Sequence, residues 1–204
     1  MGTGPHHRRP LLKWVEKYGG KVIMTSSSHQ TGTDRIAEAA EKLKLDTNDI
    51  VLNIQGDEPF INPEDIKLLG DCFTDKRTQI ATLVKKIKDF DTLTNPNSPK
   101  VIIGLQKQAL YFSREAIPHL KGYEKKDWLE KKNYFQHIGV YAFKYEVLKE
   151  VAQLKNSPLE QSEGLEQLRW LENGYKIHTA EITSDCIAVD CPEDLIRIDK
   201  KFFS

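Results

Sequence analysis

Residues 49–59 read D-I-V-L-N-I-Q-G-D-E-P, and this stretch decides the class of fold. The run from Asp49 to Gln55 is apolar, rich in β-forming residues and too short for a helix, and Gly56 closes it. A carboxylate directly after such a strand, here Asp57, lies at the C-terminal edge of the sheet in an α/β fold, where the ligands of these folds bind. We therefore predict a strand that ends at a ligand site.

A second acidic motif follows another short strand near the end of the chain. Residues 187–190 form an apolar run that ends in Asp190, and Cys191-Pro192-Glu193-Asp194 follows. Two carboxylates from two strand ends suit Mg²⁺, a hard cation that binds one or two carboxylates together with substrate phosphates. Taken singly, Asp57 can equally well open a turn and Asp190 can cap a helix. The pair is our candidate metal site.

Composition narrows the class of protein. The chain has 204 residues, enough for one well-packed domain, and 30 Lys and Arg balance 30 Asp and Glu. Zero net charge argues against a protein that binds nucleic acid through bulk charge. No apolar run approaches the roughly 18 residues of a membrane span, and the start has no apolar signal region. The three cysteines cannot all pair, so we expect a reducing cytoplasm.

Strands alternate with helices in the first half of the chain and follow one another in the second. Local signals mark the helices: Asn62-Pro63 begins one, and the capping box Ser157-Pro158-Leu159-Glu160 begins another that we expect to continue to Asn173, where Gly174 stops it. We expect strands at residues 22–25, 50–54, 80–87, 100–105, 109–113, 135–143, 176–183 and 187–190. This order predicts an α/β fold in one domain, with a mixed, mostly parallel sheet and flanking helices.

Six motifs, taken together and in order, resemble one family, the 3-deoxy-manno-octulosonate (Kdo) cytidylyltransferases, or CMP-Kdo synthetases. The resemblance starts at about Lys17 and runs to the C-terminus. The motifs are Thr31-Gly32-Thr33-Asp34-Arg35, Gln55-Gly56-Asp57-Glu58-Pro59, Tyr111-Phe112-Ser113-Arg114, His137-Ile138-Gly139-Val140-Tyr141, Leu165-Glu166-Gln167-Leu168-Arg169 and Val189-Asp190.

The resemblance implies a fold and a function. The fold is that of the nucleotide-diphospho-sugar transferases, a Rossmann-like α/β fold. The reaction is a cytoplasmic, Mg²⁺-dependent transfer of CMP from CTP to the anomeric hydroxyl of Kdo, which releases pyrophosphate and feeds lipopolysaccharide biosynthesis. The resemblance also implies a homodimer, and it gives no role to nucleic acid or membrane insertion.

The resemblance also implies roles for residues around the nucleotide. Asp57 and Asp190 would be catalytic, holding the metal that orients the α-phosphate and polarises the attacking oxygen. Gln55 would contact the ribose or the sugar. Thr31, Gly32 and Thr33 would lie beside the cytidine, with Arg35 nearby. Without the resemblance, a plain helix cap is the simpler interpretation of the Thr31 stretch.

The acceptor, an acidic sugar, needs a cation and several hydrogen-bonding groups. Arg114 can bind a carboxylate through two parallel hydrogen bonds. His137, in an apolar strand, can face either the core or a pocket, and only the resemblance favours a sugar contact for it and for Tyr141 in the same motif. Glu166 and Gln167 would reach sugar hydroxyls. Without the resemblance, a solvated helix face explains this pair equally well, because leucines already mark the buried side of the helix.

One part of the family pattern is absent. Members begin with a strand and a basic loop of the type I-P-A-R-x-x-S-T-R-L-P-G-K that wraps the CTP triphosphate. Residues 1–12 match nothing in that loop, and about 40 residues are missing, the size of one βα unit with the next strand. We therefore expect an N-terminally truncated fold that binds CTP weakly. Two alternatives remain open: another CMP-sugar synthetase, such as a CMP-sialate synthetase, or an impaired remnant that only binds nucleotide or dimerises.

Overall fold

The computed structural model describes residues 8–56 and 61–184, with the backbone alone for residues 8–12. The two candidate metal ligands, Asp57 and Asp190, therefore lie outside the described residues. The chain divides between Lys44 and Leu45 into two compact units, and each is described by itself. That the whole chain forms a single domain stays a prediction.

The first unit is two helices joined by a loop. Helix α1 spans Arg8–Lys17 and α2 spans Gly32–Lys42. Gly19, just after α1, has a φ of +78°, a left-handed conformation that glycine adopts without strain and that commonly ends a helix. The strand predicted at residues 22–25 is wrong: these residues form a loop. A strand needs a partner for its backbone groups, and the described part of this unit contains no other strand.

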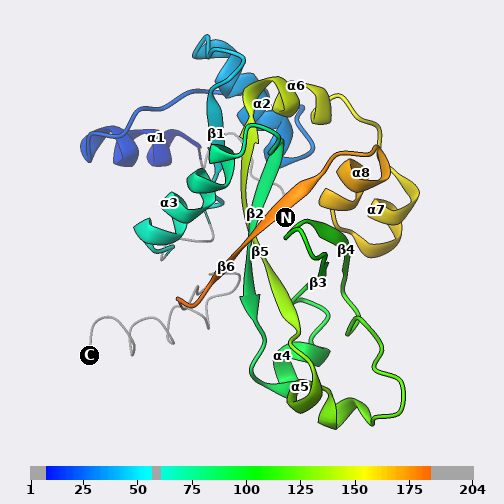
Figure 1. Cartoon of the computed structure of the whole chain (residues 1–204). Coiled ribbons are helices and arrows are strands. Elements are labelled where there is room, and N and C mark those ends of the chain that lie inside the picture. The colour runs from blue at the N-terminus through cyan, green and yellow to red at the C-terminus, as the bar shows by residue number, and fades with distance from the viewer. Residues whose placement is uncertain (1–7, 57–60, 185–204) are drawn as a thin grey trace, which may run out of the picture. The chain divides into compact units, whose positions relative to one another are not determined.

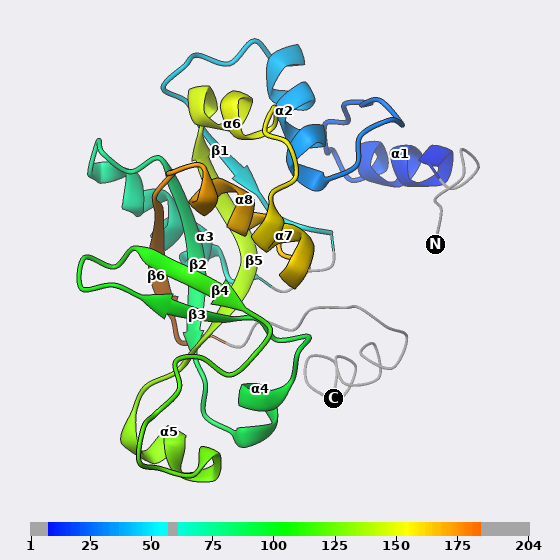
Figure 2. The same ribbon diagram turned by 90° about the vertical axis from the view of Figure 1, so that its right-hand side faces the viewer.

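The second unit is built on a six-stranded sheet in which β5 is the central element. The main path of the sheet runs β4-β3-β5-β2-β6, and β1 also pairs with β5. Figures 1 and 2 show the long β5 running alongside its partners. The strands are β1 Ile50–Asn53, β2 Ile80–Lys86, β3 Lys100–Ile103, β4 Ala109–Ser113, β5 Phe135–Lys144 and β6 Ile177–Ile182.

The sheet is mixed, as predicted, but the expectation that it is mostly parallel is wrong for the described strands. Strand β5 is antiparallel to β1, β2 and β3, and β3 is antiparallel to β4. The parallel pair is β2 with β6. Strand β5 has ten residues, and three other strands pair with it along its length. Because β5 runs opposite to all three, most of the pairings in the sheet are antiparallel.

Short helices flank this sheet. They are α3 Pro63–Asp71, α4 Phe90–Thr94, α5 Trp128–Lys131, α6 Tyr145–Val151, α7 Pro158–Glu163 and α8 Gln167–Glu172, with 3₁₀ turns η1 Cys72–Thr74 and η2 Lys125–Asp127. Asn62 accepts a hydrogen bond from the Glu64 amide at the start of α3, as its position before Pro63 predicts. The single helix expected from Ser157 to Asn173 is instead two helices, because Gly164 ends α7 with a φ of +61°.

The two faces of the sheet carry different cores. On one face, Leu69 of α3 packs with alternate residues of β5, Ile138, Val140 and Ala142, and with β2 and β6. On the other face, the rings of Tyr141 and Phe143 lie 5.0 and 5.2 Å from that of Trp170 on α8, measured between centroids. Figure 2 shows α7 and α8 over this second face. Helix α8 is thereby fixed over the C-terminal half of β5. Within the described residues, no helix has the length and apolar character that crossing a bilayer requires.

Candidate functional site

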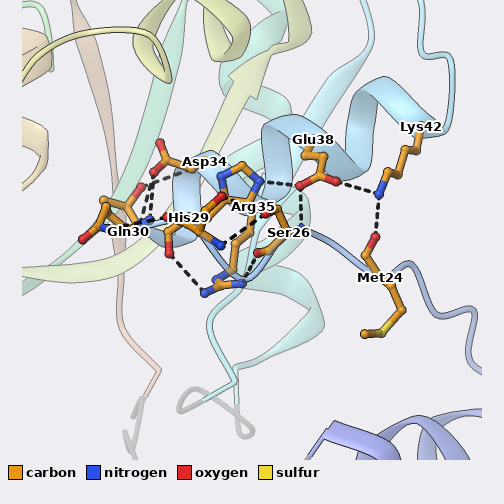
Figure 3. Close-up of polar contacts among 10 residues, drawn as sticks. Met24, Ser26, His29, Gln30, Asp34, Arg35, Glu38 and Lys42 are labelled. Atoms are coloured by element: carbon orange, nitrogen blue, oxygen red, sulfur yellow. Dashed lines mark hydrogen bonds and ion pairs between the residues drawn. The ribbon is translucent and has the colours of Figure 1, made fainter. Parts of the chain in front are cut away.

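In the first unit, the loop before α2 is held by side chains of α2 itself (Figure 3). Thr31 Oγ1 accepts a hydrogen bond from the Asp34 amide at 3.1 Å, and the Asp34 carboxylate accepts one from the Thr31 amide at 3.3 Å. This reciprocal cap satisfies the otherwise unpaired amides at the start of the helix. Thr33, which directly precedes Asp34, is buried. The motif is therefore a helix cap. The nucleotide contact of Thr31, Gly32 and Thr33 stays a prediction.

Arg35 and Glu38 bind the same loop from the helix side. The Arg35 guanidinium donates to the backbone carbonyls of Ser26 and His29, at 3.1 and 3.2 Å. The Glu38 carboxylate accepts from the Ser26 amide at 2.8 Å and pairs with the His29 ring and with Lys42. The hydrogen bond from Lys42, then those from Ser26 and His29, lower the pKa of Glu38 from 4.5 to about 2. Sequence reasoning missed Glu38, although its spacing of four residues from Lys42 is a known helix-pairing signal.

The acidic motif after β1 is described only in part. Gln55 lies beyond the end of β1 with its side chain exposed to solvent, as the strand-end prediction requires. Asp57 follows outside the described residues, as does Asp190. Among the residues that the structure does describe, no cluster of three or more His, Cys, Asp or Glu has the arrangement of a metal site.

His137 of β5 is buried and neutral. Its Nε2 lies 3.1 Å from Oγ1 of Thr82, and the Thr82 hydroxyl itself lies 2.9 Å from the Val140 carbonyl. Since one hydroxyl donates one proton, donation to Val140 leaves His137 Nε2 as the donor and Nδ1 as an acceptor. Burial lowers the pKa of His137 from 6.5 to about 3. The residue can therefore exchange hydrogen bonds with a sugar hydroxyl but carries no charge at neutral pH.

Tyr141 joins His137 to helix α8. Its ring lies 5.3 Å from the His137 ring and packs edge-on against Trp170. Burial, and then the negative charge of Glu166, raise the pKa of Tyr141 well above 10.0. The hydroxyl therefore stays protonated and can donate a hydrogen bond.

Gln167, the first residue of α8, has an unpartnered amide. The side chain is 4% exposed, and its Nε2 is buried without a hydrogen-bond partner among the described residues. A buried donor left unpaired costs about 1–3 kcal/mol, so such groups point to a missing partner. The alternative interpretation of this stretch, a solvated helix face, does not hold for Gln167, because the residue is buried at the start of a new helix after the Gly164 turn.

Arg114 binds backbone carbonyls from two loops. Its Nε donates to the Glu163 carbonyl at 2.6 Å, Nη1 to that of Pro96 at 2.9 Å, and Nη2 to that of Gly164 at 3.3 Å. A guanidinium has five N–H groups, so two remain for a ligand. The predicted carboxylate contact stays a prediction, and the structure adds a second role that the sequence did not indicate.

Five of the predicted residues meet on one face of the second unit. Arg114 directly follows β4, and Phe112 of that strand packs edge-on against His137, with ring centroids 5.0 Å apart. Tyr141 continues this row to α8, which carries Gln167 and is preceded by Glu166. This face thus carries a neutral imidazole, a phenol, an amide, a carboxylate and a guanidinium. That set can bind a polyhydroxylated, anionic ligand.

A separate hollow lies at the β6 edge of the sheet. Its volume is about 490 Å³, and it lies beside α3 and the start of β6. The residues at its polar rim include Asp71, Cys72, Lys107 and His178. None of the residues predicted from sequence lines it, so we do not assign the reaction to this hollow.

Comparison with known proteins identifies relatives along most of the chain. A family model described as cytidylyltransferase matches residues 11–177. The 3-deoxy-manno-octulosonate cytidylyltransferase of Cytophaga hutchinsonii is 50% identical over 185 residues, which are 90% of this chain and 73% of the relative. The enzyme of the same name from Bacteroides thetaiotaomicron is 51% identical over 184 residues, 89% of this chain and 73% of the relative.

Solved structures agree with these relatives. A CMP:2-keto-3-deoxy-manno-octonic acid synthetase complexed with CTP superposes with a TM-score of 0.85 at 36% identity, over 94% of this chain and 76% of the other. A 4-diphosphocytidyl-2C-methyl-D-erythritol synthase from Anaerococcus prevotii superposes with a TM-score of 0.60 at 14% identity, over 98% of this chain and 76% of the other. At that identity, the second similarity concerns the fold alone.

Proposed function

This chain belongs to the 3-deoxy-manno-octulosonate cytidylyltransferase family, and from that premise we propose that it transfers CMP from CTP to Kdo and releases pyrophosphate. The expected fold class and enzyme class are thereby confirmed. The observation that carries the acceptor half of the reaction is the convergence of Arg114, His137, Tyr141, Glu166 and Gln167 on one face of the sheet.

These five residues suit the binding of an acidic sugar. The two uncommitted N–H groups of Arg114 are offered to the carboxylate of Kdo, because a guanidinium binds carboxylates in a planar, two-bond geometry. The Gln167 amide donates to a sugar hydroxyl, which removes the cost of leaving it unpaired. Tyr141 donates and His137 accepts through Nδ1, since both are neutral at physiological pH. These contacts hold the anomeric hydroxyl in place for attack.

For the nucleotide half, we propose that the loop before α2 binds cytidine. Within the first unit, Thr31, Gly32 and Thr33 offer hydroxyl and amide groups at the start of the helix. Separately, Gln55 of the second unit has an exposed side chain just after β1, and we propose that it contacts the ribose or the sugar. Arg35 does not need to touch the nucleotide: two of its nitrogens bind the carbonyls of Ser26 and His29, so it supports the loop that does.

We further propose that Asp57 and Asp190 hold Mg²⁺. The proposal rests on the chemistry of the two side chains: carboxylates fit a hard cation that also binds phosphate oxygens. When bound, Mg²⁺ neutralises charge on the α-phosphate and polarises the attacking oxygen. Within the described residues, no competing metal cluster is present.

Three wider proposals rest on family membership alone. We propose a homodimer, a cytoplasmic location and a role in lipopolysaccharide biosynthesis. The free thiol of Cys72 agrees with a reducing compartment. Sedimentation of the purified chain measures the first of these directly.

A substrate panel tests the function. The chain is incubated with CTP, Mg²⁺ and either Kdo or a sialic acid, and the sugar nucleotide is identified by mass. We expect CMP-Kdo and no CMP-sialate. CMP-sialate as the main product would change the acceptor. CTP binding without any product would identify a remnant that only binds nucleotide.

A further inference from the structure

Glu163, the last residue of α7, lies at the junction between β4 and the turn that leads into α8. Its Oε1 accepts a hydrogen bond from the Ser113 hydroxyl at 2.7 Å, and its Oε2 accepts one from the Arg114 amide at 2.9 Å. The Arg114 side chain returns the contact by donating to the Glu163 carbonyl at 2.6 Å. The two residues are therefore linked in both directions, side chain to backbone.

The Arg114 side chain extends this link into the turn. It donates to the carbonyl of Gly164 at 3.3 Å and to that of Pro96 at 2.9 Å. The last carbonyls of a helix have no partner within the helix, and a cation near them is favourable. Lys100, the buried first residue of β3, donates to the Arg114 carbonyl at 2.5 Å and to the Asn95 carbonyl at 2.9 Å. This network fixes the backbone around Arg114.

The turn held by this network sets the position of Gln167. Gly164 has a φ of +61°, which reverses the chain, and Leu165 then enters the core. Gln167 follows two residues later, and its buried amide has no partner among the residues that the structure describes; Glu166 lies between Leu165 and Gln167. The place and direction of the two predicted sugar contacts therefore depend on where the turn is held.

We infer that Glu163 is a positioning residue for the acceptor site: through Ser113 and Arg114 it holds the Gly164–Gln167 turn, so that Gln167 and Glu166 meet the acidic sugar. This inference rests on the proposed function for the identity of the sugar. It assigns Glu163 no contact with substrate. The carboxylate serves as a double hydrogen-bond acceptor, and its negative charge is not required.

Two substitutions separate the hydrogen-bonding role from a role of the charge. Glu163→Ala removes both acceptors. Glu163→Gln keeps one acceptor for the Arg114 amide and supplies a donor to the Ser113 hydroxyl oxygen, which can accept. Glu130→Ala, at an exposed glutamate of α5, is the matched control.

The first measurement is hydrogen exchange of the backbone amides in the full chain. The amides of Gly164, Leu165 and Leu168 are hydrogen-bonded in this turn, so they are protected in the wild-type chain. We expect Glu163→Ala to exchange faster at residues 164–168 and unchanged at residues 80–86 of β2. Glu163→Gln and the control should match the wild type. Unchanged exchange at residues 164–168 in Glu163→Ala would overturn the inference.

The second measurement is steady-state kinetics. We expect Glu163→Ala to raise the KM for Kdo about 10-fold, equal to ~1.4 kcal/mol, with the KM for CTP within about 2-fold of wild type. A general loss of folding would lower the apparent kcat with the folded fraction and leave both KM values unchanged. Glu163→Gln should restore the KM for Kdo, and failure to do so with normal exchange would mean that the charge itself acts on the sugar. A wild-type chain that is inactive but shows the expected exchange pattern would contradict the proposed function and leave the positioning role supported.

Discussion

Arg169 of α8 and Glu160 of α7 form a buried ion pair through two hydrogen bonds. Arg169 Nη2 lies 2.6 Å from Glu160 Oε1, and Nε lies 2.8 Å from Oε2, with the two side chains 5% and 11% exposed. Arg169 Nη1 also donates to the Leu154 carbonyl at 2.9 Å. The pair therefore joins the two helices on either side of the Gly164 turn, independently of Glu163.

Breaking this pair should destabilise the fold. Arg169→Met leaves the Glu160 carboxylate buried without its cation, and such a loss costs about 3–5 kcal/mol. Urea denaturation measures the change in unfolding free energy. The control is Arg77→Ala, whose pair with Asp75 is exposed at the surface, with side chains 91% and 47% exposed. Exposed pairs of this kind contribute little. Equal effects of the two substitutions would contradict the buried pair.

His137 should make stability depend on pH. Its pKa is about 3 in the folded chain and near 6.5 when the chain unfolds, so the unfolded state binds more protons between these values. The contribution of neutral His137 is complete above pH 6.5 and is lost as the pH falls towards 3, with a slope of up to about 1.4 kcal/mol per pH unit.

His137→Gln should remove this part of the slope. Denaturation at several pH values between 3 and 7 compares the two chains, and His178→Gln, at the partly buried histidine of β6, is a useful reference because burial lowers its pKa as well. If the wild type and His137→Gln lose stability in parallel as the pH falls, His137 is not buried in its neutral form.

Gln167→Met should separate stability from function. The substitution removes a buried donor that has no partner within the described residues, so the unfolding free energy should stay the same or rise. The KM for Kdo should rise, because the sugar loses a hydrogen bond. Gln161→Met, at an exposed position of α7, should change neither quantity. A marked loss of stability in Gln167→Met would show that the amide is paired inside the protein.

Glu38→Ala should release the loop before α2. The carboxylate binds the Ser26 amide, the His29 ring and Lys42, so its loss should speed hydrogen exchange at Ser26 and raise the KM for CTP. In the wild type, the usual pKa of 4.5 falls to about 2 on folding, so the interaction is complete above pH 4.5 and is lost as the pH falls towards 2. Glu41→Ala, an exposed glutamate on the same helix, is the control. Slow exchange at Ser26 in Glu38→Ala would argue against this role.

The sequence predicted the features that depend on neighbouring residues. The helix starts at Asn62-Pro63 and at Ser157-Pro158 are confirmed, because capping depends on residues within one turn. Strand β5 was expected at residues 135–143 and occupies Phe135–Lys144. The helix expected from Ser157 to Asn173 was the exception, because the left-handed turn at Gly164 divides it into two helices.

Features that depend on distant residues were not predictable. The carbonyls bound by Arg114 belong to residues 18 to 50 positions away in sequence, and no local pattern indicates such contacts. The antiparallel direction of β5 against three partners is likewise a property of the folded chain. For His137, sequence reasoning left core and pocket open, and the structure shows a buried residue in the same row as Tyr141 and α8.

The central claim is that this chain transfers CMP to Kdo with the help of the carboxylates of Asp57 and Asp190. The most direct test is pyrophosphate release by the purified 204-residue chain with CTP, Mg²⁺ and Kdo, beside its Asp57→Ala and Asp190→Ala variants. We predict release that requires all three reagents and falls by at least about 100-fold in either variant. Absence of release from a folded wild-type chain, or release that survives both substitutions, would contradict the claim.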